Sequence, residues 1–381
     1  MTNNRLQQLH AAGQSVWLDY IDRAMLGDGT LQRRIRDDAI MGMTSNPTIF
    51  EKALAEGTDY DEQLAGAPQE IGAKALFELV ATDDVRTACD IFRPVYDASS
   101  GGDGYVSIEV SPALASDENG SVAEGRRLWE TVDRPNLMIK IPGTPEGARA
   151  VRRLLAEGIN VNVTLLFSRE AYDGIIEQYF CALEDRVARG EPIGRIASVA
   201  SFFVSRVDSE IDRRIDAMAD GKRDGERERL CALKGHAAIA NAKLAYRLFQ
   251  QRFSGARWDA LRAKGARFQR PLWASTSTKN PAYRDVIYVE QLVGPETVNT
   301  MPPQTLEAFR DHGETRRTVD HGYDAAERQI SALESAGISL REVTDKLLVD
   351  GLASFQKSYD QLIAGLERKM KELGREVAGT R

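Results

Sequence analysis

Short apolar runs recur along the chain, separated by longer stretches in which apolar residues repeat with the spacing of a helix. This alternation predicts strands that are each followed by a helix, the pattern of parallel βα units. Several runs are rich in Val and Ile at neighbouring positions, as expected for a sheet buried on both faces. The predicted strands are Ser15–Ile21, Ala39–Ser45, Tyr105–Val110, Leu137–Pro142, Ile159–Leu166, Ile196–Val204, Pro271–Ser277 and Val286–Val293.

Eight such units predict a single (β/α)8 TIM-type barrel that occupies residues 1–381 as one domain. Extra helices are expected in three places. An insertion at about residues 47–104 follows the second strand, and a helical tail covers about residues 322–381. The third addition follows the sixth strand, with an apolar stripe at Leu230, Leu233, Ala237, Ala240, Leu244 and Leu248. The tail either covers the active site or forms a subunit contact, and the sequence leaves both open.

Composition limits the classes of partner. Of the 381 residues, 42% are hydrophobic and 28% are charged, as in an ordinary soluble globular protein. A net charge of −7 argues against binding to nucleic acid or to an anionic membrane. No apolar run approaches the ~20 residues that span a bilayer, and the polar N-terminus lacks the apolar core of a signal peptide.

Cysteine and histidine usage argues against a metal centre. Cys89, Cys181 and Cys231 are far apart and odd in number, so neither a disulfide framework nor a zinc site is expected. The four histidines are scattered without ligand spacing, and the chain contains no nucleotide-binding loop. These features favour a cytoplasmic protein that uses neither metal nor cofactor.

Polar residues interrupt the predicted strands near their carboxyl ends, where a barrel enzyme carries its active site. Asn162 and Thr164 are two positions apart, so their side chains leave the same face of the fifth strand. The first four strands and the sixth contribute one such residue each. The set is Asp19, Asn46, Glu109, Lys140, Asn162, Thr164 and Ser201.

Lys140 is the most informative member of this set. Leu137, Ile139 and Ile141 share one face of its strand, so Lys140 points into the barrel if that face packs on helices. Burial disfavours the charged form of a lysine, and a neutral amine is the form that adds to a carbonyl. Taken alone, this strand favours a lysine that reaches solvent or pairs with a carboxylate. The company of the other strand-end residues favours a nucleophile that forms a Schiff base.

Several segments together resemble a known family. The chain is similar to the transaldolases, the class I aldolases of the pentose phosphate pathway, and to a subgroup with longer chains. The segments fall in the family's order along most of the sequence. They are Thr44–Phe50, Val106–Val110, Met138–Pro142, Asn160–Ser168 and Ser201–Asp208.

The resemblance implies a role for each catalytic position. Lys140 is expected to form the Schiff base with the ketose carbonyl. Glu109 and Thr164 are expected to hold the water that carries protons during formation and hydrolysis of the imine. Asp19 is expected to take the proton from the C4 hydroxyl as the carbon–carbon bond breaks.

It also implies two groups of binding residues. One group hydrogen-bonds the three-carbon fragment while it stays attached to the enzyme: Asn46, Asn162 and Ser201. The other binds the phosphate of the sugar: Arg206, with help from Ser277 and Lys279. A guanidinium suits this task because it offers two parallel hydrogen bonds to a phosphate.

The implied reaction moves a dihydroxyacetone unit from sedoheptulose 7-phosphate to glyceraldehyde 3-phosphate, which gives erythrose 4-phosphate and fructose 6-phosphate. One alternative is an aldolase that releases free dihydroxyacetone, and Glu109 argues against it because the related aldolases carry glutamine there. A second alternative is a barrel that binds without catalysis, which predicts loss of the lysine or the carboxylates. The expected partners are phosphorylated sugars, and the sequence leaves open whether copies of the chain form a homo-oligomer.

Overall fold

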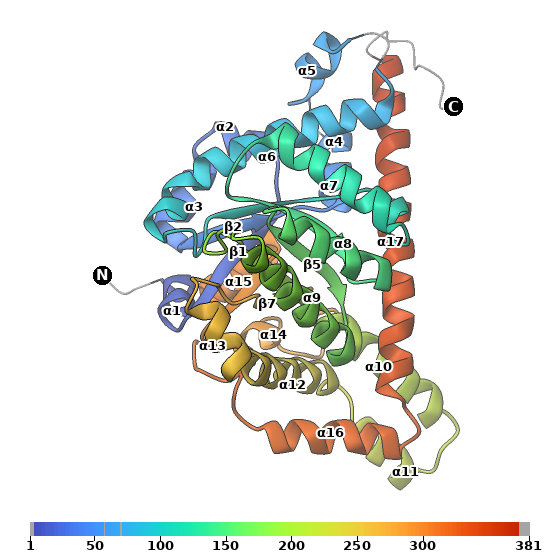
Figure 1. The fold of residues 1–381 in the computed structure, drawn as a ribbon. Helices are drawn as coiled ribbons and strands as arrows, with labels where there is room; N and C mark the ends of the chain where they lie inside the picture. The colour runs from blue at the N-terminus through green and yellow to red at the C-terminus, as the bar shows by residue number, and fades with distance from the viewer. Residues whose placement is uncertain (1–3, 57, 69–70, 373–381) are drawn as a thin grey trace.

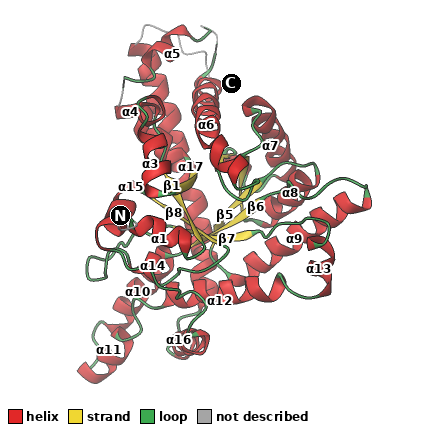
Figure 2. Cartoon of the chain, turned by 90° about the vertical axis from the view of Figure 1, so that its left-hand side faces the viewer, coloured by secondary structure: helices red, strands yellow, loops and turns green. Residues whose placement is uncertain are grey.

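The computed structural model describes residues 4–56, 58–68 and 71–372. Eight parallel strands close into a barrel in chain order, because each strand pairs with the next and β8 pairs with β1. Figure 2 shows the strands at the centre of a layer of helices. The predicted (β/α)8 fold is therefore confirmed. The strands are β1 (Gln14–Asp19), β2 (Ile40–Thr44), β3 (Tyr105–Glu109), β4 (Leu137–Pro142), β5 (Val161–Leu166), β6 (Ser198–Phe203), β7 (Arg270–Ala274) and β8 (Thr297–Met301).

Helices connect the strands and extend beyond them (Figure 1). Those before β3 are α1 (Arg5–Ala11), α2 (Arg23–Gly27), α3 (Thr30–Asp38), α4 (Pro47–Glu56), α5 (Asp61–Gly66) and α6 (Ala73–Ala98). Those between β3 and β7 are the 3₁₀ helix η1 (Pro112–Leu114), α7 (Glu118–Val132), α8 (Pro145–Ala156), α9 (Arg169–Ala188), α10 (Ser205–Ala219), α11 (Asp224–Cys231), α12 (Ala237–Arg252) and α13 (Ala256–Arg262). Those after β7 are α14 (Ile287–Glu290), α15 (Pro303–His312), α16 (Tyr323–Ser335) and α17 (Leu340–Glu372).

The eighth predicted strand is wrong. The run Val286–Val293 contains helix α14, and the strand that closes the barrel is Thr297–Met301. The apolar residues of the run repeat at helical spacing and bury one face, since Val286, Val289 and Val293 are all inaccessible. Hydropathy overlooks β8 because three of its five side chains are polar. Thr297, for example, accepts a hydrogen bond from Gln14 Nε2 at 3.0 Å inside the molecule.

The other seven strands lie within two or three residues of their predicted positions. On β4, Ile139 faces the surrounding helices, because a Cβ on Gly125 of α7 would stand 3.4 Å from Ile139 Cγ2. Alternation along the strand then directs Lys140 into the barrel, as predicted. The parallel register places Lys140 beside Glu109 on β3 and beside Asn162 on β5.

The predicted additional helices after β2, after β6 and in the C-terminal tail are present. The longest helix of the insertion is α6, which is continuous from Ala73 to Ala98. The apolar stripe after β6 is divided between α11 and α12, with Gly235 at φ +73° in the break. A Cβ at Gly235 would lie 2.6 Å from the Tyr283 ring, so close approach as well as backbone geometry requires glycine here.

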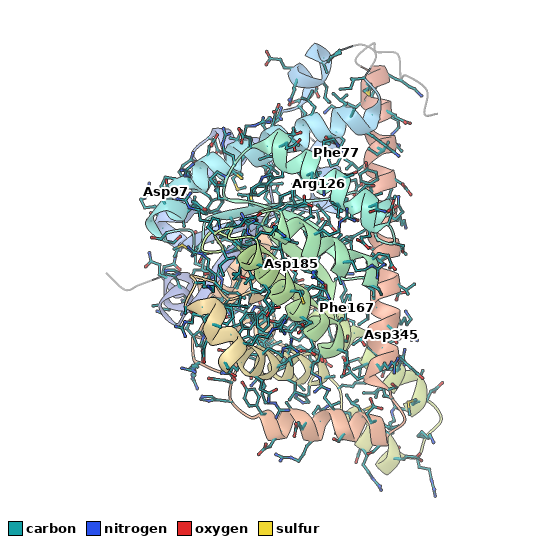
Figure 3. The ribbon with its side chains drawn as sticks, in the orientation of Figure 1. Phe77, Asp97, Arg126, Phe167, Asp185 and Asp345 are labelled. Carbon is teal, nitrogen blue, oxygen red and sulfur yellow. The ribbon has the colours of Figure 1, made fainter. Side chains whose placement is uncertain are left out.

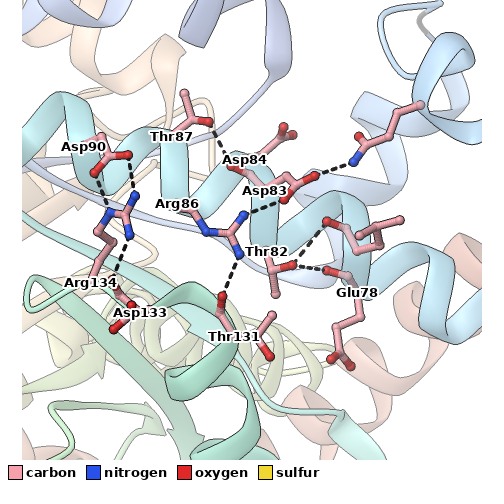
Figure 4. Close-up of polar contacts among 12 residues, drawn as sticks. Glu78, Thr82, Asp83, Asp84, Arg86, Thr87, Asp90, Thr131, Asp133 and Arg134 are labelled. Atoms are coloured by element: carbon pink, nitrogen blue, oxygen red, sulfur yellow. Dashed lines mark hydrogen bonds and ion pairs between the residues drawn. The ribbon is translucent and has the colours of Figure 1, made fainter. Parts of the chain in front are cut away.

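Arginines tie α6 to the end of α7 (Figure 4). Arg86 donates to the Asp83 carboxylate and to the carbonyl oxygen of Thr131, each at 2.6 Å. Arg134 donates twice to the Asp90 carboxylate, at 2.5 and 3.0 Å. Such exposed contacts are weak one by one, with a typical value below about 1 kcal/mol. Together they fix the position of α6 beside α7.

The last helix, α17, runs along one whole side of the molecule (Figure 1). It packs against α4, α6, α10 and the end of β5. Leu347 and Phe355, on the buried face of this helix, are each 6% exposed. The sequence left open whether this tail covers the active site, and Phe355 places it over the carboxyl ends of the strands, because its ring lies 5.6 Å from Lys140 Nζ.

Candidate active site

A cavity of about 210 Å³ lies at the carboxyl ends of the strands. In a (β/α)8 barrel this end carries the active site, because the loops that follow the strands converge there. Eight of the ten predicted site residues line the cavity, which confirms that they lie together. They are Asp19, Asn46, Lys140, Thr164, Ser201, Arg206, Ser277 and Lys279.

Lys140 lies at the centre of a buried polar cluster. Its Nζ is 3.0 Å from Glu109 Oε2, and it donates to the carbonyl oxygen of Ser45 at 3.2 Å. The residue is 5% exposed, so nearly all of its surface is shielded from water. Lys140 therefore combines two of the arrangements that the sequence allowed: it is buried in the barrel, and it pairs with a carboxylate.

Glu109 is the ninth predicted residue, and it reaches Lys140 from the neighbouring strand β3. Burial raises the pKa of Glu109, while the Lys140 ammonium acts in the opposite direction. Nearby, Thr164 Oγ1 is buried and has no hydrogen-bond partner among the described residues. A carboxylate that holds a proton readily and a hydroxyl with unused hydrogen-bonding capacity thus border the amine.

Asp19 extends from the end of β1 into the same cavity. Burial raises the pKa of Asp19, and the Lys140 ammonium and a hydrogen bond from Thr44 both oppose that shift. Thr44 Oγ1 donates to Asp19 Oδ1 at 2.7 Å. Since a hydroxyl has a single proton, the second contact of Thr44, with Thr300 Oγ1 at 2.7 Å, must have Thr300 as donor. These hydrogen bonds hold one carboxylate oxygen of Asp19 in place at the wall of the cavity.

Asn162, the tenth predicted residue, does not line the cavity. Its Nδ2 donates to Ser107 Oγ at 3.0 Å, and its Oδ1 accepts from Ser201 Oγ at 2.7 Å. The side chain is completely buried. In this arrangement Asn162 orients Ser201, whereas Ser201 and Asn46 themselves border the cavity. Direct contact of Asn162 with a substrate stays a prediction.

Two cations stand on the other side of the cavity. Arg206, at the first turn of α10, lies over the Phe203 ring at 5.2 Å and makes no ion pair among the described residues. Burial lowers the pKa of Arg206, which shows that its charge is poorly hydrated. Lys279 Nζ donates to Ser277 Oγ at 2.7 Å. Loss of hydration and the charge of Arg206 lower the pKa of Lys279. An anion placed between these cations would relieve both effects.

One family model, described as Transaldolase/Fructose-6-phosphate aldolase, matches residues 16–366 of the chain. The chain belongs to this family. The matched range includes the strands that carry Asp19, Glu109 and Lys140, and most of helix α17.

Family members of similar length align along nearly the whole chain. A protein named transaldolase from Trichodesmium erythraeum is 46% identical over 377 residues, which cover 98% of this chain and 99% of that protein. A transaldolase from Thermobifida fusca is 49% identical over 360 residues, with coverages of 94% and 96%. Transaldolase 1 of Streptomyces coelicolor is 46% identical, with coverages of 98% and 97%. The likeness therefore extends through the additional helices as well as the barrel.

Hydrogen bonds to α10 hold both the loop that carries Ser277 and Lys279 and the helix α14 that follows this loop. Tyr283 donates to Asp212 Oδ2 at 2.6 Å, and Tyr288 donates to Asp208 Oδ2 at 2.8 Å. Asp208 also accepts from the backbone N–H of Ala238 at 2.7 Å. Burial raises the pKa of Asp208 to about 6. Because Arg206 begins the same helix, these contacts set the position of the loop relative to the guanidinium.

Several cavity residues escaped the sequence prediction. Thr44 begins the segment Thr44–Phe50 that is shared with the family, and its position at a strand end is a signal that could have identified it. Thr300 lies on β8, which hydropathy did not detect. Phe355 belongs to the distant tail, and only the packing of α17 brings it to Lys140. No local signal in the sequence marks that contact.

The described part of the chain contains no cluster of three or more His, Cys, Asp or Glu side chains arranged to hold a metal ion. Within the same residues, no helix is long and apolar enough to cross a membrane.

Proposed function

We propose that this chain is a transaldolase, a transferase that moves a dihydroxyacetone unit through a Schiff base on Lys140. The observation that carries the proposal is the buried Lys140–Glu109 pair, 3.0 Å apart, beside a cavity that contains a second carboxylate and two cations. The proposed donor is sedoheptulose 7-phosphate and the acceptor is glyceraldehyde 3-phosphate. The products are then erythrose 4-phosphate and fructose 6-phosphate, as in the pentose phosphate pathway of the cytoplasm.

Imine formation needs a nucleophile and a carrier of protons. In the proposed step, Lys140 Nζ adds to the C2 carbonyl of the ketose, and the carbonyl oxygen leaves as water after it has been protonated. Glu109 accepts the proton of the amine and returns it to that oxygen. The raised pKa of Glu109 supports this role, because burial makes its carboxylate a better proton acceptor than an exposed one. The unused hydroxyl of Thr164 is available to hold the water.

Bond cleavage needs a base at the C4 hydroxyl. Asp19 takes that proton, the C3–C4 bond breaks, and its electron pair moves onto the protonated imine to form an enamine. The aldose leaves, and the acceptor aldehyde then forms a new bond to the same carbon. The burial that raises the pKa of Asp19 supports a role as base, because it makes the carboxylate more basic than an exposed one.

The substrate phosphate is proposed to lie between Arg206 and Lys279. The two cations have no carboxylate partner within ion-pair distance among the described residues, and partial burial lowers the pKa of each. A phosphate restores charge balance there, and Arg206 can bind it through two parallel hydrogen bonds. Glu109 supports transfer over release of free dihydroxyacetone, as the family resemblance implies.

The proposal is tested by trapping the imine. Incubation with fructose 6-phosphate and borohydride should add the three-carbon fragment to a single lysine, and peptide mass should place it on Lys140. A modification on any other lysine would contradict the proposal. Free dihydroxyacetone measured with and without erythrose 4-phosphate separates the two reactions: a transaldolase releases little of it and consumes the acceptor, whereas an aldolase releases it in either case.

The pH dependence should follow from the two buried carboxyls. Because burial raises the pKa of Asp19 and of Glu109, each takes up its proton at a higher pH than an exposed carboxyl. Activity as kcat/KM should therefore fall on the acid side at a pH above the usual carboxyl range. Exposed Asp37 provides a control, since Arg36 holds the pKa of Asp37 below its usual value. D37N should leave the profile unchanged, and an acid limb at the usual carboxyl pH would contradict the assignment.

A further inference from the structure

A second and larger cavity lies beside the substrate cavity, on the far side of Glu109. Its volume is about 490 Å³, compared with about 210 Å³ for the cavity that Lys140 lines. We call it the rear cavity; its walls come from α4, α6, the end of β3, η1, α7 and α17. Asn46 borders both cavities, and Glu109 links them, because it lines the rear cavity and contacts Lys140. A volume of this size is typical of sites for small organic ligands, which are roughly 300–1,000 Å³.

One wall of the rear cavity is a row of aromatic rings. Phe50 on α4 meets Phe77 on α6 edge to face at 5.5 Å, and Phe77 meets Tyr359 on α17 in the same way at 5.9 Å. Figure 3 shows Phe77 on the part of α6 that lies nearest to α17. Three elements distant in sequence therefore build this wall together. Such a row offers flat apolar surface to an aromatic ligand.

The rim of the rear cavity carries both acidic and basic side chains, and only some of them form ion pairs. Arg127 on α7 pairs with Glu78 on α6 and lies 3.8 Å from Glu124. Glu124 Oε1 accepts the backbone N–H of Ser111 at 2.6 Å, and burial raises the pKa of Glu124. Lys74 makes no ion pair among the described residues, although its charge acts on Glu124. The rim thus has one cation that is free to bind an anionic group.

We propose that the rear cavity is a binding site for a small aromatic anion. The ring system lies against the wall formed by Phe50, Phe77 and Tyr359, and the acidic group lies at the rim near Lys74. An aromatic body buried in an apolar pocket with one polar group at the mouth is the usual division of labour in such sites. The contacts between α6 and α7 in Figure 4 hold the two walls in place in the absence of a ligand.

Occupancy of the rear cavity should alter the transfer reaction, a consequence that rests on the proposed function. Glu109 borders the rear cavity, and its side chain, which is 4% exposed, contacts Lys140 at 3.0 Å, so an apolar occupant removes the little hydration that this side chain retains. Further loss of hydration favours the protonated acid over the carboxylate. The acid cannot accept the proton of the Lys140 amine, and transfer therefore slows when the rear cavity is filled.

The test uses anilinonaphthalene sulfonate, a fluorescent aromatic anion, with the full chain. One molecule should bind per chain, and saturating probe should lower kcat for transfer. Ala75 on α6 and Ala113 on η1 are exposed and border the cavity on opposite sides. A75W and A113W should each raise the Kd of the probe about tenfold or more by filling the mouth. K74Q should raise it about threefold, because the interaction is exposed to solvent.

A98W is the matched control, because Ala98 is exposed at the end of the same helix and does not border the cavity. It should bind the probe like the parent chain. Equal binding by A75W, A113W and the parent would overturn the proposed site, and binding that leaves kcat unchanged would overturn the link through Glu109. A chain that binds the probe at this site but transfers no sugar fragment would contradict the proposed function and leave the site standing.

Discussion

K140M should lower kcat for transfer by about 10⁴-fold or more, because it removes the nucleophile and no other described amine contacts Glu109. Imine formation splits the reaction into steps that each need the covalent lysine, so better binding cannot compensate for its loss. The measurement is the rate of erythrose 4-phosphate formation from sedoheptulose 7-phosphate and glyceraldehyde 3-phosphate. Borohydride trapping of K140M should yield no adduct.

The fold should survive this substitution. Methionine fits the apolar surroundings of the lysine stem, and Glu109, left without its cation, can take up a proton in place of a buried charge. K279M is the matched control, since Lys279 is a second lysine of the same cavity. It should raise KM for phosphorylated sugars yet still form the adduct on Lys140. Transfer by K140M near the parental rate would show that the nucleophile lies elsewhere.

The second large effect, a loss of stability, is expected at the opposite end of the barrel. There Asp103 joins the amino-terminal halves of β1 and β7. It accepts from Trp17 Nε1 at 2.9 Å, and Arg270 Nη2 lies 3.2 Å away. Ser15 also donates to it, and Arg270 Nη1 donates to Ser15 Oγ at 2.9 Å. D103A removes the carboxylate and leaves the largely buried Arg270 guanidinium without its ion-pair partner. Breaking a buried pair in this way typically costs about 3–5 kcal/mol.

Denaturant unfolding should therefore show a free energy of unfolding lower by that amount for D103A. The control is D97A, because Asp97 pairs with Arg93 on the exposed face of α6 at 2.9 Å and lies at the edge of the molecule in Figure 3. That change should cost less than about 1 kcal/mol. Since Asp103 lies at the amino ends of the strands, kcat of folded D103A should stay close to parental. Equal stability of D103A and the parent would mean that the network does not hold the barrel closed.

The sequence was sufficient for most of the barrel because its pattern is local. Seven strands follow from apolar runs, and the alternation on β4 directs Lys140 inward once Leu137, Ile139 and Ile141 pack on helices. Strand-end polarity predicted the cavity, since the carboxyl ends of parallel strands meet at one end of a closed barrel whatever the loops do. The family resemblance then supplied roles for those positions, and those roles stay predictions.

Hydropathy failed where burial and polarity coincide. The five residues of β8 include Thr297, Asn299 and Thr300, which are buried and hydrogen-bonded inside the molecule. A polar strand of this kind resembles a loop in sequence, while the neighbouring apolar run forms the buried face of a short helix. The strand β8 was not predicted because hydropathy scores each side chain by its preference for water or an apolar medium. Inside a barrel, buried polar side chains can instead form hydrogen bonds with one another.

Three features depend on the tertiary structure. The amide of Asn162 is turned toward Ser107 and Ser201, because neighbouring strands place those hydroxyls within hydrogen-bond distance. Phe355 covers Lys140 because α17 packs across elements more than one hundred residues away in sequence. The rear cavity exists because α6, α7 and α17 meet without filling the space between them. The periodicity of a chain determines which face of an element is buried, and it does not determine which distant element covers that face. The sequence by itself thus determined the barrel and the ends of its strands, and packing decided what closes over them.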